Sequence, residues 1–302
     1  MAASIASAEE EKMSKDNQLV AVITGSSRGI GRGIAKVLGE RKATVYVTGR
    51  TELSGTQKSP NGDPVSSSIH EVAEEINKLG GKGIAVAVDL TDDKQIRDLF
   101  ERVQREQGHL NILVNNAAYL NEKMHVRPFW DAPVDLANII DVGLRCHHVA
   151  TYYAAPLLIK GKRGLIVNIS FYGDAKVHDP AYYASKAGLD KLAQVYADEF
   201  RPFNIAAVSL WPGYVATERL VQVAERDPQV KGLKDKFGLE STEFSGRVIS
   251  ALYDDPNLLK LSGKVLLNAE VATRYGITDL KGYNPKSLRS EYGGPHKEFD
   301  LT

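Results

Sequence analysis

A tyrosine and a lysine four residues apart form the first pair of side chains that could do chemistry. They are Tyr182 and Lys186 in the segment YYASK, whose helical pattern places both on one face of a helix. A free phenol has a pKa of about 10 and is a weak acid or base near neutral pH. A nearby ammonium group lowers that pKa, so Tyr182 could exchange a proton with a carbonyl or alcohol oxygen. The spacing alone is unspecific, because Tyr and Lys stand four residues apart on many helices.

A glycine-rich turn is the second candidate site. Residues 24–31 read TGSSRGIG and stand between an apolar run and a helical pattern. Glycines allow a tight turn and a close approach of the backbone to a pyrophosphate, and the start of the helix offers free N–H groups to phosphates. This order of strand, turn and helix predicts a dinucleotide site, with a plain turn as the alternative.

The end of the next strand indicates which dinucleotide binds. Enzymes that use NAD usually carry Asp or Glu there, bonded to the ribose 2′-hydroxyl, whereas this chain has Gly49. Arg50 follows, and Arg28 lies in the glycine turn. Two guanidinium groups suit the 2′-phosphate of NADP through charge-assisted hydrogen bonds, so we predict NADP(H) as the cofactor. The alternative is that both arginines are ordinary solvated surface residues.

An alternation of strands and helices must position these residues. Runs of apolar and β-branched residues predict strands at 19–24, 44–48, 83–88, 110–115, 165–170, 205–210 and 264–267. Helical patterns cover 29–40, 69–79, 92–107, 134–159 and 182–201, and a loop rich in Ser, Thr, Gly and Pro spans 51–68. The sequence therefore predicts an α/β protein with a single Rossmann-like doubly wound domain, built from about seven parallel strands with helices on both faces.

Composition excludes several other classes of protein. Lys and Arg total 38 and Asp and Glu total 38 among 302 residues, so no overall charge favours nucleic acid or an anionic membrane surface. The single cysteine, Cys146, rules out an internal disulfide and a cysteine-based metal cluster, and no metal site is predicted. No apolar run approaches the length of about 18 residues that suggests a membrane span. A cytoplasmic protein is expected, with association with the endoplasmic reticulum as the alternative.

We expect three regions along the chain. Residues 1–17 should form a flexible leader that lacks the apolar core of a secretory signal. Residues 18–270 should form the dinucleotide-binding and catalytic domain. Residues 271–302 should form a C-terminal extension packed on or beside that domain.

The order of the motifs resembles that of the short-chain dehydrogenase/reductase family over residues 19–270. The resemblance is carried by TGSSRGIG at 24–31, DL at 89–90, NNAA at 115–118, YYASK at 182–186 and PG at 212–213. It implies that Tyr182 is the general acid/base, and that Lys186 holds the nicotinamide ribose and lowers the pKa of Tyr182. It further implies an NADP(H)-dependent oxidoreductase that transfers hydride between nicotinamide and a carbonyl or secondary alcohol.

The resemblance also implies a set of cofactor contacts. Asp89 and Leu90 would border the adenine, and Thr217 would bond the nicotinamide carboxamide. Asn115 and Ala117 would support the cofactor and the central sheet. The cofactor-binding residues expected in this way are Gly25, Ser27, Arg28, Gly29, Ile30, Gly31, Arg50, Asp89, Leu90, Asn116, Ala117, Tyr182, Lys186, Pro212, Gly213, Val215 and Thr217.

Further segments resemble a narrower subgroup, typified by dehydrogenase/reductase family member one. They are DVGLR at 141–145, SLWPG at 209–213, LSGKV at 261–265 and RYG at 274–276. This resemblance implies a carbonyl reductase that acts on a small lipophilic ketone or aldehyde, binds no nucleic acid and assembles as a homodimer or homotetramer. The helical apolar pattern at 214–224 would then close over the substrate, with ordinary packing against the sheet as the alternative.

Two positions depart from the family pattern. Gly143 stands where the family usually has a catalytic Asn, and His147 lies one turn further on, where a core or surface histidine is the better interpretation. Phe171 takes the place of the catalytic serine, which makes Ser170 the candidate catalytic hydroxyl. These departures leave a second function open, that of a catalytically weak NADP(H)-binding sensor or scaffold.

Overall fold

A computed structural model describes residues 18–55, 58, 67–172 and 179–295. The expected flexible leader at 1–17 lies outside the described residues. Most of the expected loop at 51–68 and the last residues of the C-terminal extension also lie outside them.

Seven strands form one sheet in which every neighbouring pair is parallel. Their order across the sheet is β3-β2-β1-β4-β5-β6-β7. This topology confirms the predicted doubly wound sheet, and each strand lies within two residues of its predicted bounds. The strands are β1 (Val20–Ile23), β2 (Thr44–Gly49), β3 (Lys82–Ala87), β4 (Ile112–Asn115), β5 (Gly164–Ile169), β6 (Ile205–Trp211) and β7 (Val265–Leu267).

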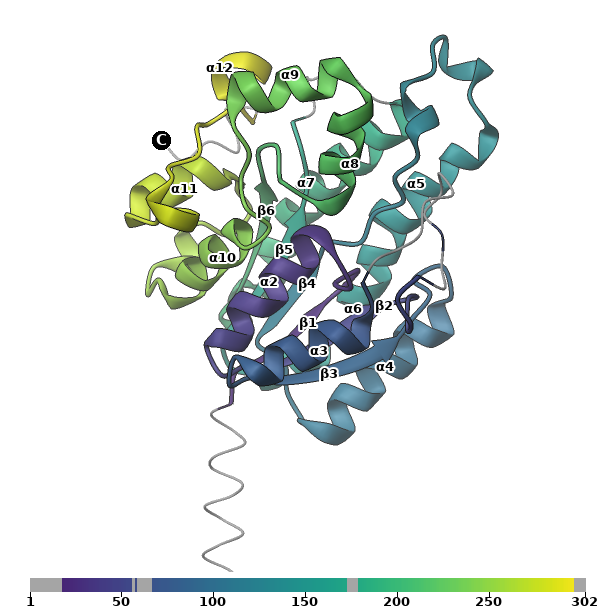
Figure 1. Cartoon of the computed structure of the whole chain (residues 1–302). Coiled ribbons are helices and arrows are strands. Elements are labelled where there is room, and N and C mark those ends of the chain that lie inside the picture. The colour runs from purple at the N-terminus through teal and green to yellow at the C-terminus, as the bar shows by residue number, and fades with distance from the viewer. Residues whose placement is uncertain (1–17, 56–57, 59–66, 173–178, 296–302) are drawn as a thin grey trace, which may run out of the picture.

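Helices cover both faces of the sheet (Figure 1). One face packs against the apolar sides of α2 (Gly29–Glu40), α3 (Ile69–Lys78), α10 (Phe244–Asp254) and α11 (Asn268–Tyr275). The other face packs against α4 (Asp93–Glu106), α6 (Cys146–Lys160) and α7 (Pro180–Phe200). Strands β1, β4, β5 and β6 are buried along their whole length because helices cover both of their faces, whereas the edge strand β3 is only half-buried.

Three helices gather near the carboxyl ends of the strands, at the top of Figure 1. They are α8 (Glu218–Arg226), α9 (Pro228–Phe237) and α12 (Arg289–Tyr292). The ring of Tyr292 packs against those of Tyr214 and Phe237, and the Leu288 N–H donates to the Tyr172 hydroxyl over 3.3 Å. Helix α12 and the residue before it therefore pack against the segment after β6, the end of α9 and Tyr172.

The predicted single helix at 134–159 is interrupted. A 3₁₀ turn at Val134–Ala137 leads through α5 (Asn138–Ile140) into a π-helical turn at Asp141–Arg145, and only then does α6 begin. Gly143 lies in the middle of the π turn, where a Cβ atom would come within 2.6 Å of the Ser185 hydroxyl. The apolar pattern predicted the helical course but not the change in hydrogen bonding, because a π turn has no distinct apolar spacing.

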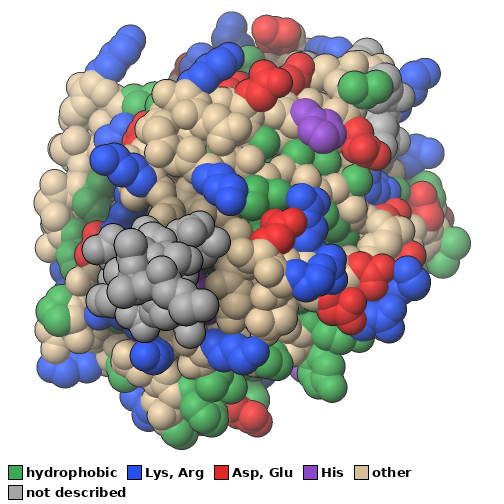
Figure 2. Space-filling model, turned by 90° about the horizontal axis from the view of Figure 1, so that it is seen from below, with side chains coloured by type: hydrophobic (Ala, Val, Ile, Leu, Met, Phe, Trp, Pro, Cys, Tyr) green, Lys and Arg blue, Asp and Glu red, His purple; other side chains and the backbone are tan. Residues whose placement is uncertain are grey.

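The surface carries charges of both signs. On the face shown in Figure 2, Lys and Arg side chains are interspersed with Asp and Glu side chains, and neither sign forms a continuous patch. None of the helices in the described part of the chain combines the length and apolar composition needed to cross a bilayer.

Candidate active site

The strand order reverses between β1 and β4, and doubly wound sheets usually bind their ligand outside the strand ends at such a point. The Thr24 hydroxyl, just after β1, accepts the N–H groups of Asn116 and Ala117 over 2.9 and 3.1 Å. The Asn116 side chain donates to the carbonyls of Thr24 and Gly25 over 2.9 and 3.0 Å. These bonds fix the two strand ends relative to each other, so the predicted residues Gly25, Asn116 and Ala117 meet at one edge of the sheet.

The glycine turn leaves room that a side chain would fill. Gly25 has a φ of +64°, and a Cβ atom there would lie 2.8 Å from the Ala117 Cα. A Cβ atom on Gly31 would lie 2.5 Å from the Asn116 amide nitrogen. Helix α2 starts at Gly29, and the Arg28 side chain does not cap it. The narrow turn and the helix N-terminus together fit the pyrophosphate of a dinucleotide.

Two arginines lie near the glycine turn, Arg28 within it and Arg50 just after β2. Burial lowers the pKa of Arg28, the charge of Glu218 raises it, and the nearby charge of Arg50 lowers it. The Arg50 guanidinium lies 4.0 Å from the Asp89 carboxylate. The predicted residues Arg28, Arg50 and Asp89 therefore lie close together. Of the predicted set, two arginine side chains and one aspartate side chain meet there.

The start of α7 positions Tyr182 and Lys186. The Asp179 side chain accepts the Ala181 N–H over 2.8 Å, and Pro180 occupies the first helical position, so both are good helix starters. Tyr182 and Lys186 are 8% and 6% exposed. The Lys186 Nζ lies 5.5 Å from the centroid of the Tyr182 ring and donates to the Ile169 carbonyl over 2.9 Å.

Burial controls the ionisation of this pair. It raises the pKa of the Tyr182 phenol, and the Tyr183 side chain raises it further. Burial also lowers the pKa of Lys186 to about 8, against an opposing effect of the Asp190 carboxylate. The pKa of Tyr182 is thus raised rather than lowered as expected, because burial disfavours the charged phenolate. A phenol with a raised pKa stays protonated at neutral pH and can act as a proton donor.

Ser170 and Phe171 directly follow β5, and their side chains contact different parts of the molecule. The Ser170 hydroxyl is buried and donates to the Lys186 carbonyl over 3.1 Å, so it faces α7. The Phe171 ring centroid lies 6.4 Å from that of Tyr182 and 6.3 Å from that of Tyr214. An aromatic ring therefore borders Tyr182 where the family pattern has a hydroxyl.

The segment after β6 is held by a buried carboxylate that the sequence analysis missed. Glu240 accepts the Gly213 N–H over 2.9 Å, and its own backbone bonds to Tyr214 and Ala216 over 2.7 and 2.9 Å. The Asn268 amide donates to the other carboxylate oxygen over 2.9 Å. Burial raises the pKa of Glu240 to about 7. No sequence motif includes Glu240, because its contact with Gly213 joins two residues that are 27 positions apart in the chain.

Thr217, another member of the predicted cofactor set, lies beside the glycine turn, where its methyl group would be 3.2 Å from a Cβ atom on Gly29. The Thr217 hydroxyl accepts the Leu220 N–H and caps α8, and the adjacent Glu218 carboxylate accepts the Gly29 N–H over 3.0 Å. Glu218, a second residue that the sequence analysis missed, thus joins α8 to the glycine turn. Further members of the set are buried or half-buried, namely Ser27, Ile30, Leu90, Pro212 and Val215.

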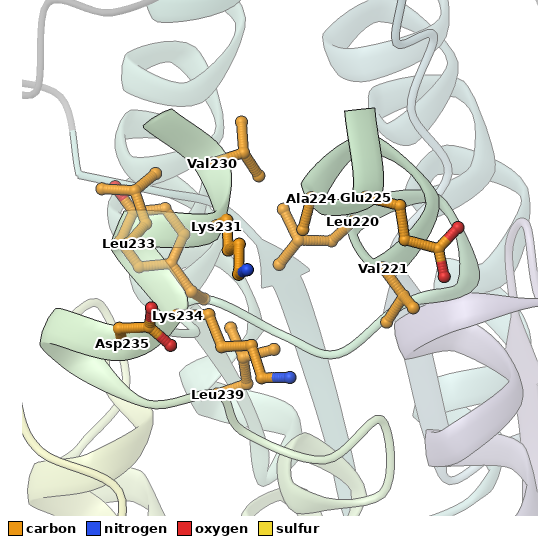
Figure 3. A pocket seen from close by; sticks show the side chains of 11 residues that line it. Leu220, Val221, Ala224, Glu225, Val230, Lys231, Leu233, Lys234, Asp235 and Leu239 are labelled. Atoms are coloured by element: carbon orange, nitrogen blue, oxygen red, sulfur yellow. The ribbon is translucent and has the colours of Figure 1, made fainter. Parts of the chain in front are cut away.

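A pocket of about 280 Å³ opens between α8 and α9 (Figure 3). Leu220 and Ala224 of α8 face Val230 and Lys231 of α9 across it. Tyr214 also lines the pocket and contacts Phe171, which contacts Tyr182. The pocket therefore borders the aromatic side chains around Tyr182, and its walls are largely apolar.

Known proteins share these features. The sequence model of the short chain dehydrogenases matches residues 19–228. Human dehydrogenase/reductase SDR family member 1 is 41% identical over 278 residues, which cover 88% of this chain and 84% of the relative. The 3-oxoacyl-[acyl-carrier-protein] reductase FabG of Aquifex aeolicus is 30% identical over 214 residues, 70% of this chain and 79% of the relative. A solved dehydrogenase chain from Xanthomonas campestris has a TM-score of 0.73 at 24% identity, covering 88% of this chain and 93% of that chain, and so shares the fold.

Proposed function

The chain belongs to the short-chain dehydrogenase/reductase family, and from this premise we propose that it is an NADP(H)-dependent carbonyl reductase. Oxidoreductases of this family use a nicotinamide cofactor and act on CH–OH groups or on the corresponding carbonyls. The observation that carries the proposal is the buried pair of Tyr182 and Lys186 beside a glycine turn that fits a pyrophosphate. The glycine turn and α2 would hold the phosphates, and Lys186 the nicotinamide ribose.

Two observations support NADP(H) over NAD(H). Strand β2 ends at Gly49, so it offers no carboxylate for the ribose 2′-hydroxyl. Arg28 and Arg50 lie near enough to each other for the charge of Arg50 to lower the pKa of Arg28. A 2′-phosphate between them would relieve this repulsion and accept hydrogen bonds from both guanidinium groups.

The chemistry needs a hydride donor and a proton donor. Bound NADPH supplies the hydride to the carbonyl carbon. The Tyr182 hydroxyl donates its proton to the carbonyl oxygen, and Lys186 places a positive charge beside the phenolate that remains. Phe171 excludes water from one side of Tyr182, which strengthens these electrostatic interactions. The reverse direction uses the same groups.

The pocket between α8 and α9 supports a lipophilic substrate. Leu220, Val221, Val230, Leu233 and Leu239 line it, and such walls favour a ketone or aldehyde with a large apolar group. The name of the bacterial relative, a 3-oxoacyl reductase, supports a ketone as the reacting group.

We propose in addition that the protein is a homodimer or homotetramer. Tyr152 on α6 and Val195 on α7 are 69% and 42% exposed, and Phe203 just after α7 is 45% exposed. Large exposed apolar side chains on these two helices support an interface between copies. Light scattering on the purified protein tests the assembly.

The test of the proposed function is a binding and turnover experiment on the full chain. NADPH and NADH are titrated by the enhancement of their fluorescence, and oxidation of each is then followed with aromatic, steroidal and dicarbonyl substrates. We expect tighter binding of NADPH and turnover of at least one lipophilic carbonyl. Equal affinity for the two cofactors would contradict the assignment of NADP(H), and binding without turnover would favour the second candidate.

That second candidate is a catalytically weak NADP(H)-binding sensor, which is favoured by the Phe171 ring at the position of the family serine. The variant Phe171→Ser separates the two functions. If the protein is a weak catalyst for lack of a hydroxyl donor, kcat should rise about tenfold or more in Phe171→Ser, since one such donor contributes about 3 kcal/mol in other enzymes. If the native site is complete, kcat should stay the same or fall.

A further inference from the structure

Helix α7 carries a partly buried carboxylate that the proposed reaction does not yet use. Asp190 stands four residues after Lys186, so helix geometry places the two side chains on the same face of α7. The Asp190 Oδ1 atom accepts the Ser209 hydroxyl and, over 3.0 Å, the indole N–H of Trp211. Both donors belong to β6, so the carboxylate is held against the sheet.

Ser170 connects Asp190 to Lys186. Burial raises the pKa of Asp190, and hydrogen bonds from the two donors of β6 and from Ser170 oppose this effect. The Ser170 hydroxyl also lies 3.1 Å from the Lys186 carbonyl oxygen. The Lys186 Nζ in turn donates to the carbonyl of Ile169, the residue before Ser170, over 2.9 Å. The end of β5 therefore contacts both Lys186 and Asp190, which belong to one hydrogen-bonded network.

The buried ammonium of Lys186 needs a counter-charge. Burial lowers the pKa of Lys186 to about 8, and the charge of Asp190 opposes this effect. The other titratable groups near Lys186 are Tyr182 on α7 and His147 on α6, whereas β5 offers the uncharged carbonyl of its last residue. Both side chains are uncharged at neutral pH, because burial raises the pKa of Tyr182 and lowers that of His147 to about 3. Among the described residues, Asp190 is therefore the group that can balance the charge of Lys186.

We propose that the negative charge of Asp190, held in place by the donors of β6, keeps Lys186 protonated in its buried site. Asp190 is a positioning residue, because it acts through Lys186 rather than on the substrate. The ammonium stabilises the phenolate that remains when Tyr182 gives up its proton, so Asp190 extends carbonyl reduction to higher pH. This inference rests on the proposed carbonyl reduction.

Asp190→Asn removes the charge and can keep the contacts. The asparagine Oδ1 atom can accept the same two donors from Ser209 and Trp211, and the Ser170 hydroxyl retains the Lys186 carbonyl as an acceptor. The matched control is Asp198→Asn, because Asp198 lies further along the same helix and is exposed.

The test is the pH dependence of kcat for the oxidation of NADPH with a lipophilic carbonyl. In Asp190→Asn we expect the fall in kcat at high pH to begin about one pH unit lower than in the native protein. Turnover should then drop about fivefold at pH 8, where native Lys186 is about half protonated, and change by less than about 1.5-fold at pH 6. Asp198→Asn should follow the native profile.

Two outcomes would overturn the proposal. One is the native pH profile in Asp190→Asn. The other is a loss of kcat by the same factor at every pH, which would indicate that the carboxylate only supports the packing of α7 on the sheet.

A second measurement keeps this test separate from that of the proposed function. Carbon-13 NMR of the full chain labelled at the lysine Cε atoms, with the Lys186 signal assigned from Lys186→Met, reports the protonation of Lys186 as the pH is raised. We expect its titration midpoint to lie about one pH unit lower in Asp190→Asn than in the native protein. An unchanged midpoint would refute the role of Asp190. A lowered midpoint in a protein that reduces no carbonyl would support that role and contradict the proposed function alone.

Discussion

At the residue scale, the proposed preference for NADP(H) depends on the charges of two arginines near the glycine turn. The charge of Arg50 lowers the pKa of Arg28, so the two lie close together, and the Asp89 carboxylate lies 4.0 Å from the Arg50 guanidinium. An anion placed between the arginines would gain two charge-assisted hydrogen bonds, each worth about 1.5–3 kcal/mol. NADH has a hydroxyl at that point and gains little.

Arg28→Ala and Arg50→Ala should each weaken NADPH binding by about tenfold or more and change NADH binding by less than about twofold. The measurement is a fluorescence titration with both cofactors. Arg105→Ala is the control, because this arginine is exposed on α4. Equal loss of affinity for NADPH and NADH in the arginine variants would contradict the assignment of the 2′-phosphate site.

At the scale of elements, the segment from β6 to α8 depends on one buried carboxylate. Glu240 bonds to the Gly213 N–H, and its backbone pairs with Tyr214 and Ala216. The residue that follows this segment, Thr217, caps the N-terminus of α8. The position of the segment expected to contact nicotinamide is thus set by a residue that no motif includes.

The stability of this arrangement should depend on pH. The pKa of Glu240 is raised from 4.5 to about 7 in the folded protein, so folding favours the protonated carboxyl. That contribution is fully present below pH 4.5 and is lost as the pH rises through about 7. Relative to Glu240→Gln, which stays neutral, the native protein should lose about 2 kcal/mol of unfolding free energy between pH 5 and pH 8.

Urea unfolding of both proteins at the two pH values measures this difference. The Gln side chain can keep both contacts, because the Asn268 amide has an unpartnered Oδ1 that can turn toward it. Glu199→Gln, an exposed site on α7, should show no such difference. The same pH dependence in Glu240→Gln as in the native protein would contradict a raised pKa at Glu240.

The strands and helix α7 could be predicted from the sequence, whereas two buried or bridging carboxylates and the π turn could not. The run at 165–170 is apolar because β5 is buried on both faces, and its pattern predicts the strand directly. Tyr182 and Lys186 share a face through helix geometry alone. Glu240, Glu218 and the π turn at Gly143 were missed, because they depend on long-range contacts or on hydrogen bonding that leaves the apolar spacing unchanged.

At the scale of the whole molecule, the doubly wound order brings distant parts of the chain to one edge of the sheet. The glycine turn after β1, the strand end at Asn116 and the segment after β6 meet there. Helices α8, α9 and α12 lie near this edge, and the pocket opens between α8 and α9 (Figures 1 and 3). The glycine turn, Tyr182 and the pocket are therefore all carried by one domain.

The most direct test of this account is the turnover of NADPH with a lipophilic carbonyl by Tyr182→Phe. Phenylalanine keeps the ring that packs against Phe171 and removes only the hydroxyl. We expect kcat to fall at least about a hundredfold with unchanged affinity for NADPH, since general acid catalysis contributes about 10²–10⁴. Tyr183→Phe, which removes the neighbouring hydroxyl, should retain activity. Undiminished turnover by Tyr182→Phe would contradict the account, because the proton would then come from another group.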